Sequence, residues 1–129
     1  MKRILLALTL ILLTAGVASA QVKGASITVE GDATYDFKDI KEADGPVTHI
    51  FKIKNDGDAP LVVTKVVASC GCTTPDWTKE PIAPGKTGEI KVTYDPTGRP
   101  NAFAKTISVY SNGKTSSYVL TIKGNVIPK

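Results

Sequence analysis

Two cysteines that stand one glycine apart are the residues of this chain whose type and spacing suit redox or metal chemistry. Cys70, Gly71 and Cys72 follow an apolar, strand-like run, and the 129-residue sequence contains no other cysteine. Each thiol can therefore form a disulfide only with the other or with a second chain. Residues i and i+2 can be bridged when the backbone turns, and the central glycine permits such a turn. We expect a disulfide or redox pair at Cys70 and Cys72.

A structural role and a redox role for this pair both remain open. Closing a loop of about three residues stabilises a fold by only about 1.5 kcal/mol on the chain-entropy formula. In the structural role the bridge stiffens a loop at a strand end, and Trp77 is close enough in sequence to cover it. In the redox role a strained bridge exchanges with thiols. No helix N-terminus is expected nearby to stabilise a thiolate, although Lys65 or Lys79 could lie close to it.

A metal site is a third role, in which Cys70, Cys72 and His49 together bind copper or zinc. The chain has no methionine after Met1, and His49 is its only histidine. A single histidine on a strand face is usually packed or hydrogen-bonded, and a closed zinc site would lack an obvious fourth ligand. We therefore expect no bound metal and no cofactor.

Hydrolytic and phosphoryl-transfer chemistry find little support in the sequence. A serine triad would have to use His49 as its base, and no Gly-x-Ser-x-Gly elbow is present. No glycine-rich phosphate loop precedes a helix pattern. We expect no catalytic residues and a protein that is not an enzyme, with thiol–disulfide exchange as the enzymatic alternative.

The first twenty residues predict export from the cytoplasm. Met1-Lys2-Arg3 gives a positive start, residues 4–17 form an apolar run, and Ala18-Ser19-Ala20 fits a signal-peptidase site. The apolar run is shorter than the roughly 20 residues that a membrane span needs. We predict that residues 1–20 are a cleaved signal peptide and that residues 21–129 form one periplasmic or extracellular domain without a membrane span.

The charge of the predicted mature chain gives no support to a role in nucleic-acid binding. Removing 20 residues leaves 129 − 20 = 109, which is the size of one domain. Removing two basic residues leaves 16 − 2 = 14 basic against 12 acidic side chains, a net charge of +2. The lysines are scattered singly, as on a solvated surface, and form no basic cluster.

The remaining segments alternate with period two and are punctuated by proline and glycine, which predicts an all-β chain. A bulge is expected near Thr64-Lys65, Trp77 is expected in a short irregular segment, and Asn112-Gly113 predicts a tight hairpin. About seven short strands favour an immunoglobulin-like two-sheet β-sandwich over a small barrel. The expected strands span residues 25–30, 34–37, 47–54, 61–68, 87–94, 103–110 and 116–122, the last extending toward Val126.

Several motifs follow one another along the predicted mature chain. They are Phe51-x-Ile53-x-Asn55-x-Gly57-x-x-Pro60-Leu61, Ser69-Cys70-Gly71-Cys72-Thr73, Pro81-Ile82-x-Pro84-Gly85-x-x-Gly88-x-Ile90, Lys105-x-Ile107-x-Val109-x-Ser111-Asn112 and Ile122-x-Gly124-x-Val126. Together they closely resemble the secreted bacterial family called domain of unknown function 1573. The resemblance implies a periplasmic or surface-located immunoglobulin-like module, and it implies no established activity.

These observations favour a binding or structural module of the bacterial cell envelope. Its expected partner is another envelope protein or an envelope polymer, and its oligomeric state is not determined by the sequence. The edge strands of a sandwich can pair with an extended segment of a partner, which offers one way to bind. A thiol–disulfide redox protein that uses Cys70 and Cys72 is the alternative, followed by a copper- or zinc-binding protein.

Overall fold

The computed structural model describes residues 24–129, so the predicted signal peptide lies outside the described residues. The described chain consists of short strands and one short 3-10 helix, η1 (Glu42–Asp44). None of its helical segments has the length and apolar character for a membrane span. The strands are β1 (Ile27–Val29), β2 (Thr34–Lys41), β3 (Val47–Asn55), β4 (Val63–Ala68), β5 (Thr73–Trp77), β6 (Thr87–Tyr94), β7 (Asn101–Ser111) and β8 (Ser117–Ile127).

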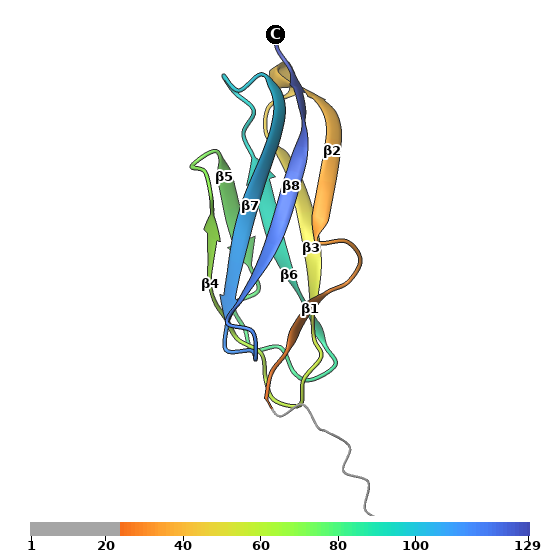
Figure 1. Cartoon of the computed structure of the whole chain (residues 1–129), viewed down its shortest axis with the longest axis vertical. Helices are drawn as coiled ribbons and strands as arrows, with labels where there is room; N and C mark the ends of the chain where they lie inside the picture. Colours follow the sequence, from red (N-terminus) through yellow and green to blue (C-terminus); the bar gives the residue numbers. More distant parts are fainter. Residues whose placement is uncertain (1–23) are drawn as a thin grey trace, which may run out of the picture.

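The strands form two four-stranded sheets with the orders β1-β3-β6-β5 and β2-β8-β7-β4, packed as a sandwich (Figure 1). All neighbours are antiparallel except β2 and β8, which run parallel. This is the strand order of an immunoglobulin-type sandwich whose first strand is divided between the two sheets. The predicted two-sheet fold is confirmed, and β5, which is not among the seven expected strands, brings the number of strands to eight.

The core lies between the two sheets and follows the alternation of the sequence. In β6, Ile90, Val92 and Tyr94 are buried while the residues between them are more exposed. The rings of Tyr94 and Phe103 stack between the sheets, with centroids 4.0 Å apart and planes 9° apart. The other buried apolar side chains with no more than 1% exposure are Ile53, Leu61, Ile107, Val109, Leu120, Ile122 and Val126.

The predicted bulge in β4 is confirmed. Val63 pairs with Ser111 but Lys65 pairs with Tyr110, so one extra residue is accommodated in β4 at Thr64. The Thr64 hydroxyl donates to the carbonyl oxygen of Tyr110 at 3.2 Å, which fastens the bulge to β7. The bulge corrects the phase of the strand, so that both Val63 and Val66 reach the core.

The segment that contains Trp77 is a strand, so the prediction of an irregular segment is wrong. Residues Thr73–Trp77 pair with β6, and Pro75 lies opposite Val92. A proline within a short run lowers the strand signal, yet an edge strand tolerates it because alternate N–H groups point away from the sheet. β5 is such an edge strand.

The Asn112-Gly113 pair lies between β7 and β8 as expected, but it does not form a two-residue turn. The connection spans residues 112–116, and Gly113 lacks the positive φ that such a turn requires. The Asn112 side chain instead accepts a bond from the Val62 N–H at 2.8 Å and donates to the Pro60 carbonyl at 3.1 Å. These bonds hold the entrance of β4 against the end of β7, which the tight turn would not do.

Asn55 organises the loops at the opposite end of β3 from the helix η1. Its side chain is completely buried, donates to the carbonyl oxygens of Ala59 (2.7 Å) and Ile82 (2.8 Å), and accepts from the Gly57 N–H (2.9 Å) and the Ser26 N–H (3.3 Å). One amide group therefore satisfies four backbone groups from three chain segments. The Asn55-Asp56-Gly57-Asp58 turn is fixed by this side chain.

Candidate functional site

The Cys70–Cys72 turn connects the two sheets at one side of the sandwich. β4 ends at Ala68 in one sheet, and β5 begins at Thr73 in the other. In the structure the two sulfur atoms are joined, with the Cα atoms 5.1 Å apart. The turn therefore sits where the chain leaves β4 and crosses to the neighbouring edge strand (Figure 1).

Backbone hydrogen bonds fasten the turn to both sheets. On the β4 side, the Ser69 N–H donates to the Thr106 carbonyl at 2.9 Å, and the Thr106 N–H donates to the Ser69 hydroxyl at 3.1 Å. On the β5 side, the Asp95 N–H donates to the Cys72 carbonyl at 2.9 Å. Within the turn, the Thr73 N–H donates to the Cys70 carbonyl at 3.1 Å. The loop is held by these bonds as well as by the sulfur atoms.

The two cysteines differ in their exposure. Cys72 is 5% exposed and belongs to the core, whereas Cys70 is half-buried and Gly71 is exposed. Gly71 has no positive φ, and a Cβ added there would meet no atom within 4 Å. The turn therefore does not need glycine for its conformation or for space. Cys70 is thus the more exposed residue of the pair.

Trp77 lies away from the cysteine turn. It occupies the far end of β5, about 16 Å along an extended strand from Cys72. The ammonium group of Lys79 lies 4.3 Å from the Trp77 ring centroid and 3.0 Å from the Asp76 carboxylate. The hydrogen bond from Lys79 and that from the Trp77 N–H lower the pKa of Asp76. The structure thus places Gly71 with the cysteines and Trp77 in a separate cation–aromatic cluster with Lys79.

His49 is packed against aromatic rings and not against the cysteines. Its ring stacks on Tyr35 with centroids 3.7 Å apart, and it meets Phe51 edge-on at 4.6 Å. Burial lowers the pKa of His49. β3, which carries His49, is separated from β5 by β6. Among residues 24–129, no three His, Cys, Asp or Glu side chains gather as a metal site would require.

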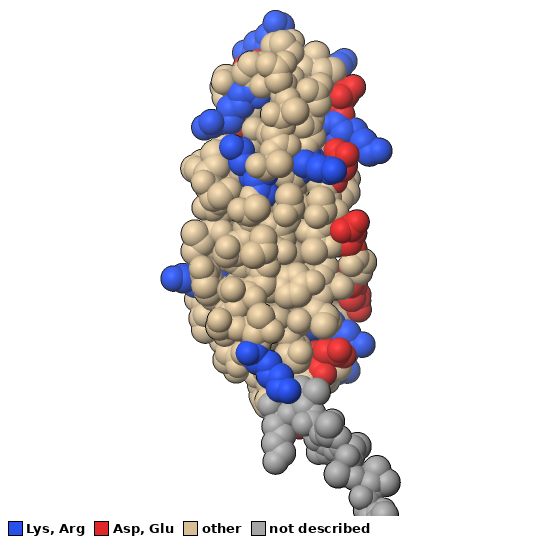
Figure 2. Space-filling model, viewed as in Figure 1, with Lys and Arg blue, Asp and Glu red and all other residues tan. Residues whose placement is uncertain are grey.

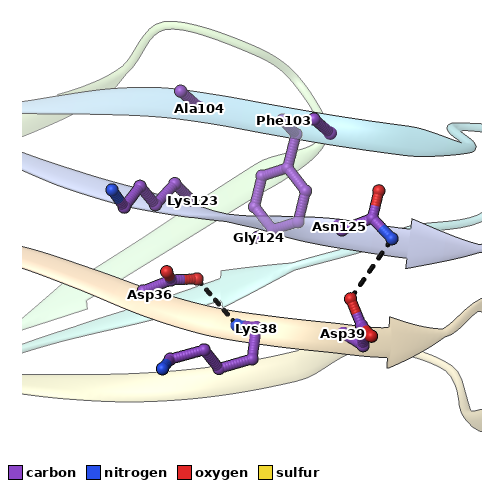
Figure 3. A pocket seen from close by; sticks show the side chains of 9 residues that line it. Asp36, Lys38, Asp39, Phe103, Ala104, Lys123, Gly124 and Asn125 are labelled. Carbon is purple, nitrogen blue, oxygen red and sulfur yellow. Dashed lines mark hydrogen bonds between the residues drawn. The ribbon is translucent and has the colours of Figure 1, made fainter.

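A depression of about 630 Å³ lies where β2 is interrupted (Figure 3). Lys38 has a φ of 63°, and its N–H is bound at 2.8 Å by the carboxylate of Asp36. Asn125 donates to Asp39 at 3.3 Å across the β2–β8 pair. These two hydrogen bonds account for the positions of Asp36, Asp39 and Asn125 in the depression. Their arrangement is therefore explained by the β2–β8 pairing and is not taken as a sign of catalysis.

The outer face of the β2-β8-β7-β4 sheet carries an uncharged area. Val67, Ser108 and Val119 form one row across three strands, and Val67 and Val119 are 46% and 52% exposed. Figure 2 shows that the part of this face over β4 and the start of β8 carries charged side chains only near its margins. At one margin the Lys65 ammonium lies 4.8 Å from the Tyr110 ring centroid. The sequence shows these residues as ordinary strand positions, because only pairing brings them into one row.

Comparison with protein families gives a match over most of the described chain. Residues 27–126 match the family described as "Protein of unknown function (DUF1573)". The chain belongs to the DUF1573 family. The resemblance seen in the sequence motifs is thereby confirmed. No curated protein matches this DUF1573 chain.

Solved structures similar to this DUF1573 chain share its fold at low sequence identity. A protein of unknown function from Porphyromonas gingivalis W83 has a TM-score of 0.68 and 18% identity, covering 84% of this chain and 50% of its own. The ASH/PapD-like domain 7 of human CEP192 has a TM-score of 0.61 and 7% identity, covering 95% and 99%. The secreted serine protease VesC from Vibrio cholerae has a TM-score of 0.55 and 13% identity, covering 80% and 23%. The chain thus spans half of the Porphyromonas protein and under a quarter of VesC.

Proposed function

We propose that this DUF1573 chain is a binding module of the bacterial cell envelope, exported to the periplasm or the cell surface, and that it is not an enzyme. The observation that carries the proposal is the uncharged row Val67–Ser108–Val119 on the outer sheet face. Cores of protein interfaces are depleted of charge, and tyrosine, here Tyr110 at the outward position next to Ser108, is enriched in them. The family and the immunoglobulin-like neighbours fit a binding or structural role.

Thiol–disulfide exchange is the second candidate, and one specific observation favours it. Cys70 is the more exposed residue of the pair, so an external thiolate would attack its sulfur and release Cys72 as the leaving thiolate. That step forms a mixed disulfide on Cys70 and breaks the bond between the two cysteines. The binding proposal needs no such step.

A capture experiment under non-reducing conditions tests both proposals. Tagged protein is expressed in its native envelope as wild type, as Val119→Lys and as Cys70→Ser/Cys72→Ser. The binding proposal expects the wild type and the double serine variant to retain the same partner and Val119→Lys to lose it, because a charge would be buried at the interface. Thr121→Lys, at the next outward position of β8, is a matched control for the site of the charge. A partner that is covalently attached and lost only from the serine variant contradicts the binding proposal.

Export is tested separately by the intact mass of protein recovered from the envelope. We expect a chain that begins at Gln21, because Ala18-Ser19-Ala20 fits the cleavage site. Protein that retains residues 1–20 contradicts the proposed localisation.

A further inference from the structure

The four edge strands of the sandwich differ in how readily they could accept another strand. An edge strand pairs with its neighbour through alternate residues, and the intervening residues point their N–H and C=O groups away from the sheet. Those outward groups decide whether a partner strand can add to the edge. In this fold the edges are β1 and β5 in one sheet and β2 and β4 in the other.

The edge of β5 has no outward donor to offer. The hydrogen bonds at the two ends of the β5–β6 pairing show which residues of β5 bond to β6. By alternation, the residues whose backbone groups point away from the sheet are Thr73, Pro75 and Trp77. The Thr73 N–H already donates to the Cys70 carbonyl at 3.1 Å. The Trp77 N–H donates to the Asp76 carboxylate at 2.9 Å, and Pro75 has no N–H. β5 is therefore protected against strand addition.

The edges on the other side of the sandwich are short or interrupted. β1 has only three residues, Ile27–Val29, before the chain moves to the second sheet. β2 is interrupted at Lys38, whose φ is 63°, and its pairing with β8 is irregular between Asp36 and Asp39. β2 therefore presents no unbroken row of outward groups. β1 presents the outward groups of Ile27 and Val29, so it is the edge against which β4 has to be compared in a test.

The edge of β4 is regular beyond its bulge and remains open. The Ser69 N–H donates to the Thr106 carbonyl at 2.9 Å, so by alternation Val66 and Ala68 direct their backbone groups outward. Within residues 24–129, these outward groups of Val66 and Ala68 have no hydrogen-bond partner. Variable-type immunoglobulin domains extend this same edge with a strand of their own. Here the chain crosses to the other sheet through the Cys70–Cys72 turn.

We propose that an extended segment of a partner protein pairs with β4 and becomes a fifth strand of the β2-β8-β7-β4 sheet. This inference rests on the proposed binding function and names the edge that the partner uses. The inward side chains of the added strand would face the neighbouring edge β5, where Pro75 and Trp77 are half-buried. Apolar side chains at alternate positions suit that environment.

The charge on β4 defines the other face of the partner strand. Lys65 is the only charged residue of β4, and it lies on the outer face beside Tyr110. An acidic residue placed opposite Lys65 in the added strand forms a cross-strand ion pair, whereas a lysine there is repelled. The partner segment is thus extended, apolar on alternate positions and acidic on its outer face.

The test uses synthetic octapeptides and amide NMR spectra of the 15N-labelled protein. Each peptide is capped at both ends and alternates valine with threonine or serine, and one outward position is glutamate or lysine. We expect the glutamate peptide, at up to about 1 mM, to shift the amides of Val66 and Ala68 more than those of β1 or β2. Lys65→Glu should reverse the preference between the two peptides. Absence of a shift with either peptide, or shifts centred on β1, β2 or β5, overturns the proposal.

Ala68→Pro removes one outward N–H of β4 without removing a ladder bond to β7. The substitution should weaken the binding of the glutamate peptide by about tenfold, as expected for the loss of one hydrogen bond. Val29→Pro, at an outward position of β1, is the matched control and should leave binding unchanged. A peptide methylated on alternate amides repeats the test on unaltered protein if Ala68→Pro does not fold. Equal binding of the methylated and unmethylated peptides contradicts pairing through the backbone.

The two proposals can fail separately. If the envelope partner is captured equally by the wild type and by folded Ala68→Pro, the module binds through another surface and the β4 inference is wrong. If the glutamate peptide binds at β4 but the envelope yields no partner, the β4 inference stands and the proposed function fails.

Discussion

Asn55 Nδ2 donates to the carbonyl oxygen of Ile82 at 2.8 Å, in a part of the molecule that is closed to solvent. The bond joins the end of β3 to the segment that precedes β6. Leu61 pairs with Ile82 through both of their backbone groups, at 2.9 and 2.8 Å, so the same region also fixes the approach to β4. The loops at this end of the sandwich therefore depend on one amide side chain.

Asn55→Ala should destabilise the fold by about 3 kcal/mol, because four backbone groups lose their partner and some of them stay buried. Denaturant melts measure the loss. Asn112→Ala removes two bonds at an exposed site and should cost about 1 kcal/mol. Similar losses for the two variants would show that the burial of Asn55 adds nothing to its role.

Removing the disulfide should leave a folded protein. Cys70→Ser/Cys72→Ser should lose no more than about 2 kcal/mol, because the loop is short and backbone bonds also hold the turn. Ile90→Ala and Leu120→Ala should each cost about 2 to 5 kcal/mol, because each leaves a cavity in the core. An unfolded double serine variant would place the disulfide among the main supports of the fold.

Two glycines should respond in opposite ways to alanine. Gly71→Ala should leave stability unchanged or raise it by up to about 1 kcal/mol, because its φ and its surroundings accept a Cβ. Gly57→Ala should cost more than about 2 kcal/mol, because the added Cβ would overlap the Gly24 carbonyl oxygen and the Ser26 nitrogen. Thermal melts compare the two. A destabilised Gly71→Ala would mean that the turn requires glycine after all.

Stability should fall as the pH drops below about 6.5, the ordinary pKa of histidine. Burial lowers the pKa of His49, so the unfolded chain binds the proton more readily than the folded one. The contribution of His49 to the free energy of unfolding is present in full above about pH 6.5. It is lost as the pH falls toward the lowered pKa of His49. Urea melts between pH 5 and 8 test this, because the lowered pKa values of Asp76 and Asp95 affect only more acidic solutions. His49→Phe should retain the stacking on Tyr35 and abolish the decrease, and a persisting decrease would exclude His49 as its source.

The sequence predicted the parts of the fold that alternation controls. β6 has the bounds that its pattern predicted, and the bulge at Thr64 followed from the opposite phases of Val63 and Val66. Alternation could not reveal β5, because Pro75 interrupts a run of five residues and only the pairing with β6 makes it a strand. The prediction of a tight turn at Asn112 was wrong for a similar reason. The bond that the Asn112 side chain accepts from the Val62 N–H depends on a contact between segments that are distant in the sequence.

The candidate site was predictable only in its cysteines. Adjacency in sequence correctly identified Cys70 and Cys72 as a pair. It wrongly suggested that Trp77 covers them, because each residue of the extended strand β5 moves the chain about 3.3 Å further from the cysteines. The row Val67–Ser108–Val119 and the open groups of Val66 and Ala68 depend on register and on which strand is an edge. Asn55 had a weak signal, since an asparagine before Asp-Gly at a strand end is typical of a turn that a side chain fixes.

The parallel pairing of β2 with β8 also governs how the molecule would respond to a pull. The described chain starts at one pole of the sandwich and ends at the other (Figure 1). Tension between these two ends would slide β2 and β8 past each other along their length, from Thr34–Thr121 to Lys41–Ile127. On each side of the irregularity between Asp36 and Asp39, the hydrogen bonds of that pair would be loaded together in shear and not opened one after another.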